Sequence, residues 1–167
     1  MLEDLNIKNF ALIDSVSIEF NKGFTVLSGE TGAGKSILIG ALSFLLGGKA
    51  SVEQIRAGTA EASVSGTFLL AGHAAAQSWL DAHGISIEND RVLLRRVIKE
   101  SGKSSAWIEG TPVTRADLGE FSLFLVDIHG QHEHQSLMHP ASHRVFLDSF
   151  AGIVLEVEAF TALYGEL

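Results

Sequence analysis

The residues of this sequence best suited to chemistry form one glycine-rich segment that ends in a lysine and a serine. The segment reads Gly29, Glu30, Thr31, Gly32, Ala33, Gly34, Lys35 and Ser36. In a Gly-x4-Gly-Lys-Ser pattern the glycines let backbone N–H groups point at phosphate oxygens, while the lysine and the hydroxyl reach the terminal phosphates and Mg²⁺. We therefore expect a nucleoside triphosphate site in which Lys35 supplies the charge and Ser36 ligates the metal ion.

The elements on either side of this segment suit a phosphate-binding loop. A short apolar strand is predicted over 24–27, after a turn at 21–23, and it runs directly into the loop. A mostly apolar helix is predicted over 35–46 and is stopped by two glycines at 47–48. A loop that opens a helix adds the positive end of the helix dipole to the phosphate site.

Hydrolysis of the nucleotide needs more groups than the loop supplies. An acidic Mg²⁺ partner on a second strand and a group that positions water are both required. The nearest candidate acid, Asp127, stands alone before Ile-His-Gly and matches such a strand end poorly. We therefore expect an incomplete active site, which argues against the alternative of a self-contained P-loop nucleotide kinase or GTPase that does not act on DNA.

The composition is that of one globular domain. The chain has 167 residues, 46% of them hydrophobic, a formal net charge of −8 and no cysteine, which excludes disulfides and thiolate metal sites. Residues 1–4 lack the pattern of a secretory signal, and the longest apolar run, 37–46, is about half of a membrane span. We expect a soluble, cytoplasmic protein without membrane association.

Alternation, turn signals and helix caps predict the remaining elements. Strands are expected over 2–6, 16–20, 61–70, 91–99, 104–109 and 121–128. Helices are expected over 74–83, closed by Gly84, and from Thr114, a good N-cap, through 120.

Apolar side chains recur with heptad spacing at the end of the sequence. The positions are Ile153, Val157, Phe160, Tyr164 and Leu167. Such a seam is typical of a coiled coil, and two heptads also fit an amphipathic helix that packs on its own domain. Spacing alone weights the two interpretations equally.

Four stretches together resemble the RecN family of bacterial recombination and repair proteins, which are SMC-like ABC ATPases. They are the opening 5–14, the loop and its continuation 29–39, the hairpin region 102–110, and the segment 127–135, which is similar to a Q-loop. The resemblance implies an α/β fold, a P-loop NTPase head lobe of ABC/SMC type. Such a lobe has an antiparallel β subdomain and a mainly parallel core sheet, and it leads into a coiled-coil helix.

The same resemblance assigns domains and residue roles. Residues 1–150 would be the amino-terminal half of a head, and residues 151–167 the start of the ascending coiled-coil helix. Lys35 and Gln131 would be catalytic, with Gln131 as the Q-loop glutamine that contacts Mg²⁺ or the attacking water. ATP would be bound by the loop and by the backbone N–H of Ile37, where many ABC ATPases carry a second hydroxyl residue.

The function that this resemblance implies is ATP-driven work on broken DNA. ATP with Mg²⁺ would lie between two heads of a homodimer, each completed by the C-terminal half of the same head. That half would hold the Walker B strand and the signature motif, so the chain alone is expected to be inactive. Double-stranded DNA, at its ends or single-stranded tails, would be engaged at the nucleoid in recombinational repair of double-strand breaks.

Three further features have two interpretations each. A histidine cluster could bind a transition metal or be an ordinary part of the Q-loop region, namely His129, His132, His134, His139 and His143. Arg91, Arg95 and Lys99 would share one strand face, either as a strip that contacts DNA phosphates or, as we favour, as a solvated face. Arg56 would touch the nucleotide or lie exposed in its loop.

Overall fold

The computed structural model describes residues 1–28, 33–70, 72–126, 128 and 140–165. The chain divides into two compact units, Met1–Val126 and Asp127–Leu167, each of which is described by itself. The sequence predicts a different boundary, at 150/151, between an ATPase head and a coiled-coil helix. The division into compact units does not test that boundary, which stays a prediction.

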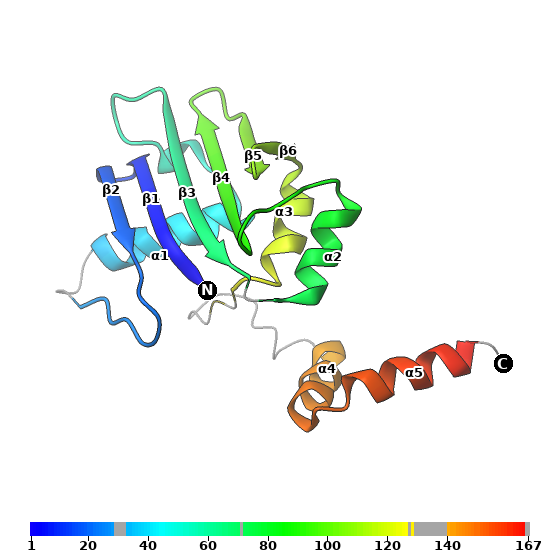
Figure 1. Ribbon diagram of the computed structural model, residues 1–167. Helices are drawn as coiled ribbons and strands as arrows, with labels where there is room; N and C mark the ends of the chain where they lie inside the picture. The colour runs from blue at the N-terminus through cyan, green and yellow to red at the C-terminus, as the bar shows by residue number, and fades with distance from the viewer. Residues whose placement is uncertain (29–32, 71, 127, 129–139, 166–167) are drawn as a thin grey trace. The chain divides into compact units, whose positions relative to one another are not determined.

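One antiparallel sheet of six strands organises the first unit (Figure 1). Its order is β2-β1-β3-β4-β5-β6, and every pairing between these strands is antiparallel. The strands are β1 (Leu2–Phe10), β2 (Ile13–Glu19), β3 (Glu61–Leu69), β4 (Arg91–Lys99), β5 (Ser104–Ile108) and β6 (Thr111–Val113). The alternating segments of the sequence thus form strands as predicted, with one face apolar and buried and the other polar.

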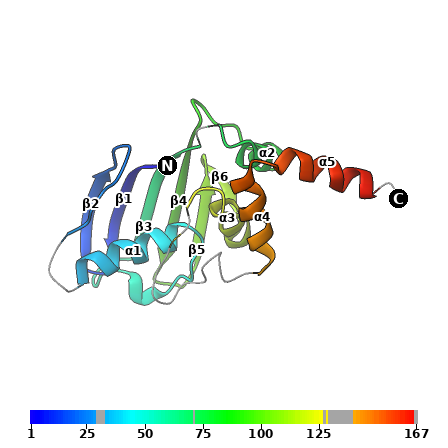
Figure 2. The ribbon, with the colours of Figure 1, turned by 90° about the horizontal axis from the view of Figure 1, so that it is seen from below.

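Helix α1 (Ala33–Leu45) lies across the apolar face of this sheet (Figures 1 and 2). Its buried residues Ala41, Phe44 and Leu45 belong to the same core cluster as Leu5 and Val64 of the sheet. A 3₁₀ turn, η1 (Val52–Gln54), follows it. The helix that the sequence predicts after the phosphate loop is therefore present, and the sheet fixes its position.

Two shorter helices lie beside strands β4–β6 (Figures 1 and 2). They are α2 (Ala74–Ala82) and α3 (Arg115–Ser122), as the sequence predicts. At the start of α3, Thr114 and Asp117 form a capping box in which each side chain accepts a hydrogen bond from the other residue's backbone N–H.

The strand predicted over 121–128 is not formed. Helix α3 instead continues to Ser122, and hydrogen-bonded turns follow as far as Val126. Leu118, Phe121 and Ser122 are the buried residues of α3, and their spacing of three and four is the helical period. The apolar run was mistaken for a strand because a short apolar segment carries no periodicity that separates the two structures.

The strand predicted over 24–27 is also absent, and with it the mainly parallel core sheet in the part of the chain that the structure describes. The segment pairs with no described strand. Phe24 has 93% of its surface exposed, and Val26 and Leu27 are exposed as well. A strand needs a neighbour to satisfy its backbone N–H and C=O groups, and no described strand lies beside this segment.

The second unit is a pair of helices, α4 (Pro140–Ala151) and α5 (Val154–Gly165). Gly152, with φ of +70°, separates them, a conformation that glycine adopts without strain. The heptad positions Val157, Phe160 and Tyr164 lie on α5, whereas Ile153 precedes it. The coiled coil itself stays a prediction.

The contact between Gly47 and α3 yields a stability test. Gly47 has φ of +97°, and a Cβ there would lie 2.8 Å from the Cα of Gly119. We expect Gly47→Ala to lower the free energy of unfolding by clearly more than the ~1 kcal/mol that left-handed backbone alone costs, as measured by urea denaturation. Gly23→Ala is the matched control, because Gly23 has φ of +107° and open space around it. Equal losses in the two variants would contradict the packing role.

Candidate nucleotide site

The described part of the phosphate loop is the first turn of α1. Gly34, Lys35 and Ser36 lie in this turn, Lys35 half-buried and Ser36 exposed. The turn contains no acidic residue. No carboxylate of the turn itself therefore competes with a bound anion for the positive end of the helix dipole. Backbone N–H groups at such a helix start are available to phosphate oxygens.

A hollow of about 490 Å³ opens beside this turn. One wall comes from β2, through Ile13, Val16 and Ile18. The rest is lined by Leu27, Ser28, Gly34, Lys35 and Leu38. The volume is typical of small-ligand pockets, and Lys35 with Ser28 supplies its polar groups in an otherwise apolar wall.

The other predicted nucleotide residues divide into two groups. Ile37 is half-buried in α1, where the core cluster packs against it. Gly29, Glu30, Thr31, Gly32, Asp127 and Gln131 lie outside the described residues. The predicted contacts of Gln131 with Mg²⁺ or water therefore stay predictions.

The C-terminal end of α1 is held by a buried arginine of β4. Arg96 has 1% of its surface exposed. Its Nη1 donates hydrogen bonds to the carbonyl oxygens of Phe44 and Gly48, its Nε donates to Ser104 Oγ, and its guanidinium lies 4.4 Å from the Phe44 ring centroid. A cation at this end complements the negative end of the helix dipole.

Burial and the positive charge of Arg115 together lower the pKa of Arg96 to about 10, with burial the larger cause. Arg96 is therefore still a cation at neutral pH. The sequence predictions do not single out Arg96 and so miss this role. The available signal was alternation, since Arg96 falls in phase with Val92, Leu94 and Ile98 on the buried face of the strand.

The predicted basic strip on β4 does share one exposed face, and two of its members are paired with acids. Arg91 donates to both carboxylate oxygens of Glu3, at 2.7 and 3.0 Å, and this hydrogen bond and charge raise its pKa. Lys99 lies 4.0 Å from a Glu61 oxygen, and Arg95 lies over the Trp107 ring. Paired surface cations offer less charge to DNA, which favours a solvated face.

Arg56 is turned toward the β1–β2 turn. Its Nη1 donates to the Leu12 carbonyl oxygen at 2.7 Å, and its backbone N–H donates to Asn9. The described contacts of Arg56 are thus structural, and a nucleotide contact stays a prediction.

The histidine cluster falls almost wholly outside the described residues. Of its members only His143 is described, on α4 and exposed. No group of three or more His, Cys, Asp or Glu residues suited to a metal ion occurs within the described ranges.

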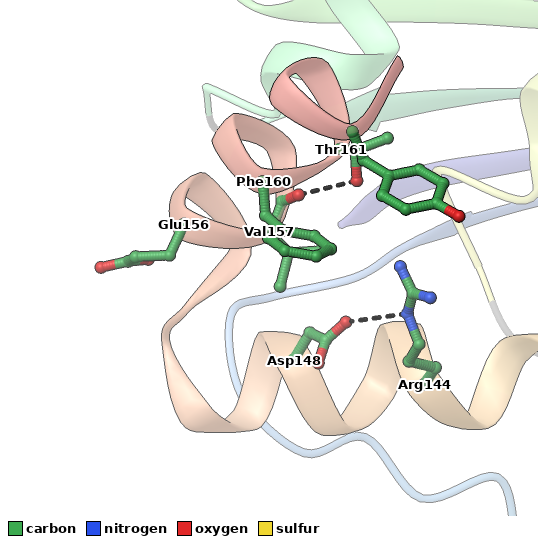
Figure 3. Close-up of a pocket in the computed structure, with 7 residues that line it drawn as sticks. Arg144, Asp148, Glu156, Val157, Phe160 and Thr161 are labelled. Carbon is green, nitrogen blue, oxygen red and sulfur yellow. Dashed lines mark hydrogen bonds and ion pairs between the residues drawn. The ribbon is translucent and has the colours of Figure 1, made fainter. Parts of the chain in front are cut away.

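A second hollow, of about 540 Å³, lies within the helix pair of the C-terminal unit (Figure 3). Val157 and Phe160 of α5 face Arg144 and Asp148 of α4 across it, and Tyr164 of α5 also lines it. Arg144 and Asp148 form an ion pair at 3.5 Å, and the two aromatic rings stack 6.2 Å apart. Phe160 and Tyr164 are about two-thirds exposed, so the apolar seam of α5 is uncovered within this unit.

Comparison with known sequences finds similarity to a family of N-terminal domains and to curated relatives. The RecF/RecN/SMC N terminal domain family model matches residues 1–127. The chain is 52% identical to DNA repair protein RecN of Treponema pallidum and 45% identical to that of Bacillus subtilis. These alignments cover 100% and 99% of the chain but 29% and 28% of the relatives. The chain thus spans less than a third of their length.

Comparison with solved structures finds a similar fold in SMC ATPase structures. A chain from work on ATP-driven dimerization and DNA-stimulated activation of SMC ATPases matches with a TM-score of 0.60 and 26% identity, over 89% of this chain and 98% of that one. An Smc head bound to the C-winged helix domain of ScpA matches with a TM-score of 0.57 and 31% identity, over 72% and 39%. Among the described helices, none is long and apolar enough to cross a membrane.

The support that Arg96 gives to α1 is testable. Arg96→Met keeps much of the side-chain volume but removes the guanidinium donor from the Phe44 and Gly48 carbonyl oxygens. The Phe44 oxygen keeps only its longer hydrogen bond from the Gly47 N–H, at 3.3 Å. We expect a loss of about 1–3 kcal/mol in the free energy of unfolding, measured by urea denaturation. Arg95→Met, on the exposed face of the same strand, should change stability by less than about 0.5 kcal/mol. A similar small effect at both positions would show that the capping contacts contribute nothing.

Proposed function

The chain belongs to the RecF/RecN/SMC N-terminal domain family, and on this premise we propose that it is the amino-terminal half of an ATP-binding head of a RecN-type protein. In this proposal the whole protein hydrolyses ATP and acts in recombinational repair of DNA double-strand breaks. The observation that carries the nucleotide part is the start of α1, where Lys35 and Ser36 stand on an acid-free first turn beside a hollow. The kinase or GTPase alternative is not favoured, because the family match covers residues 1–127.

The residues present fit a nucleotide with its metal ion. Lys35 would bind the β- and γ-phosphates as a point charge, and the exposed Ser36 hydroxyl would hold Mg²⁺. Backbone N–H groups of the loop and of Ile37 would complete the phosphate contacts. When bound, ATP supplies a γ-phosphate whose loss on hydrolysis distinguishes two states of the head. Gln131 would contact Mg²⁺ or the attacking water and so couple the presence of the γ-phosphate to movement of the head lobes.

The first partner in this proposal is the C-terminal half of the same head, and the observation that supports it is the extended segment 24–27. Phe24, Val26 and Leu27 are exposed although they are apolar, and the segment has no strand beside it among the described residues. A strand added from the C-terminal half would satisfy this backbone and cover these side chains. It would also form the core sheet and bring in the acidic Mg²⁺ partner that hydrolysis requires.

The remaining partners follow from the same composite site. A second head in a homodimer would close over the nucleotide, and contacts to the γ-phosphate present only in the closed state would shift the equilibrium toward dimer. The uncovered seam of α5 supports the start of a coiled coil there. Double-stranded DNA, at ends or single-stranded tails, would be the substrate in the cytoplasm, at the nucleoid.

The nucleotide role predicts a defined loss on removing Lys35. We expect Lys35→Ala to weaken binding of a fluorescent ATP analogue by ~10- to 100-fold, because a charge-assisted contact to phosphate is lost. The measurement uses the chain mixed with its separately expressed C-terminal half, with and without Mg²⁺. Lys22→Ala removes an exposed lysine that precedes segment 24–27 and should leave affinity unchanged. Unchanged affinity of Lys35→Ala would refute the assignment of the loop.

The docking role of segment 24–27 predicts a loss of assembly without a loss of folding. We expect Phe24→Asp to abolish co-purification with the C-terminal half, since a charge would be buried in the joint sheet. The chain's own unfolding free energy should change by less than about 0.5 kcal/mol, because the side chain is 93% exposed. Leu12→Asp, at a position 71% exposed on the β1–β2 turn, should assemble normally. Retained assembly of Phe24→Asp would exclude this surface.

A further inference from the structure

A third hollow, of about 320 Å³, lies at the far end of α1 from the phosphate loop. Its polar lining consists of Lys49, Arg96, Ser104, Ser105, Thr114 and Arg115. All of these residues belong to the first unit. The thirteen residues of α1 separate this hollow from the Lys35 end by about 20 Å, so the hollow is distinct from the nucleotide site.

The charged groups of this hollow are all of one sign. Lys49, Arg96 and Arg115 line it together with the hydroxyl groups of Ser104 and Ser105, and no carboxylate does. Among the described residues, no Asp or Glu forms an ion pair with any of the three cations. The acid nearest in sequence, Asp117, accepts its hydrogen bond from the Thr114 N–H within the capping box.

Arg96 brings unused donors to the hollow from a buried position. Its Nη1 and Nε are engaged with Phe44, Gly48 and Ser104, while Nη2 donates to no group in the described part of the chain. A guanidinium carries five N–H donors, so two remain for a ligand. Arg115 disfavours the charge on Arg96, which burial already disfavours, and an anion between them would relieve both costs.

We propose that this hollow binds a phosphate dianion, either free phosphate or the terminal phosphate of a nucleic acid strand. Three cations around one small space suit a doubly charged tetrahedral group better than a carboxylate, whose single charge would leave two cations uncompensated. The hydroxyls and the Arg96 Nη2 group supply donors to several oxygens at once. This site is independent of ATP binding, and its failure would leave the proposed function intact.

The test is a phosphate titration of the Lys35→Ala chain, in which the loop no longer competes for the anion. Backbone amide signals of Lys49, Ser104 and Arg115 are followed by NMR while sodium phosphate is added, against sodium chloride at equal ionic strength. We expect saturable shifts with phosphate only. The double variant Lys49→Gln/Arg115→Gln should weaken binding by at least ~10-fold, whereas Lys22→Gln/Lys103→Gln, with the same charge removed elsewhere, should not. Arg96 is left in place because α1 depends on it.

A second arm identifies the source of the phosphate. A 5′-phosphorylated single-stranded oligonucleotide is compared with the same strand ending in a 5′-hydroxyl. Tighter binding of the phosphorylated strand, lost in the Lys49→Gln/Arg115→Gln variant, identifies a nucleic acid end as the ligand. Saturation by inorganic phosphate without that preference identifies free phosphate. The proposal is overturned if phosphate shifts do not saturate, if chloride reproduces them, or if the double variant binds as well as the parent.

Discussion

The buried guanidinium of Arg96 is the contact on which the placement of α1 depends. It joins β4 to the last carbonyl groups of the helix and packs on Phe44, so sheet and helix meet at one charged side chain inside an apolar core. A buried cation is tolerated only where its donors find partners. The carbonyl oxygens at the helix end, each with two lone pairs, provide such partners, and Arg96 and α1 therefore stabilise each other's burial.

The two ends of α1 have different roles, since the first turn belongs to the candidate phosphate site and the last turn is a structural contact. The first turn carries Lys35 and contains no acidic residue, while the last turn is closed by a protein cation. Within the described residues, the charge that complements the helix dipole thus comes from Arg96 at its negative end, and the positive end suits a bound anion. A helix fixed to the sheet by Phe44 and Leu45 holds Lys35 in a set position, so binding of phosphate would not have to order the helix first.

The sequence was informative wherever structure is local. Alternation in β4 placed Arg91, Arg95 and Lys99 on one face, Thr114 marked the start of α3, and the glycine-lysine-serine spacing located the first turn of α1. It misled where the outcome depends on distant partners. Segment 24–27 has no described strand beside it, and the start of 121–128 follows the helical burial of Phe121. No sequence prediction concerns Arg96, whose partners Phe44 and Gly48 lie about fifty residues away.

The bare segment 24–27 also has a bearing on how this polypeptide behaves in solution. Phe24 and its neighbours present an exposed apolar stretch that pairs with no described strand, which is a template for pairing between copies. The net charge of −8 acts against such self-association by mutual repulsion. Colloidal stability should therefore fall with added salt, as repulsion between copies is screened while the apolar stretch keeps its attraction.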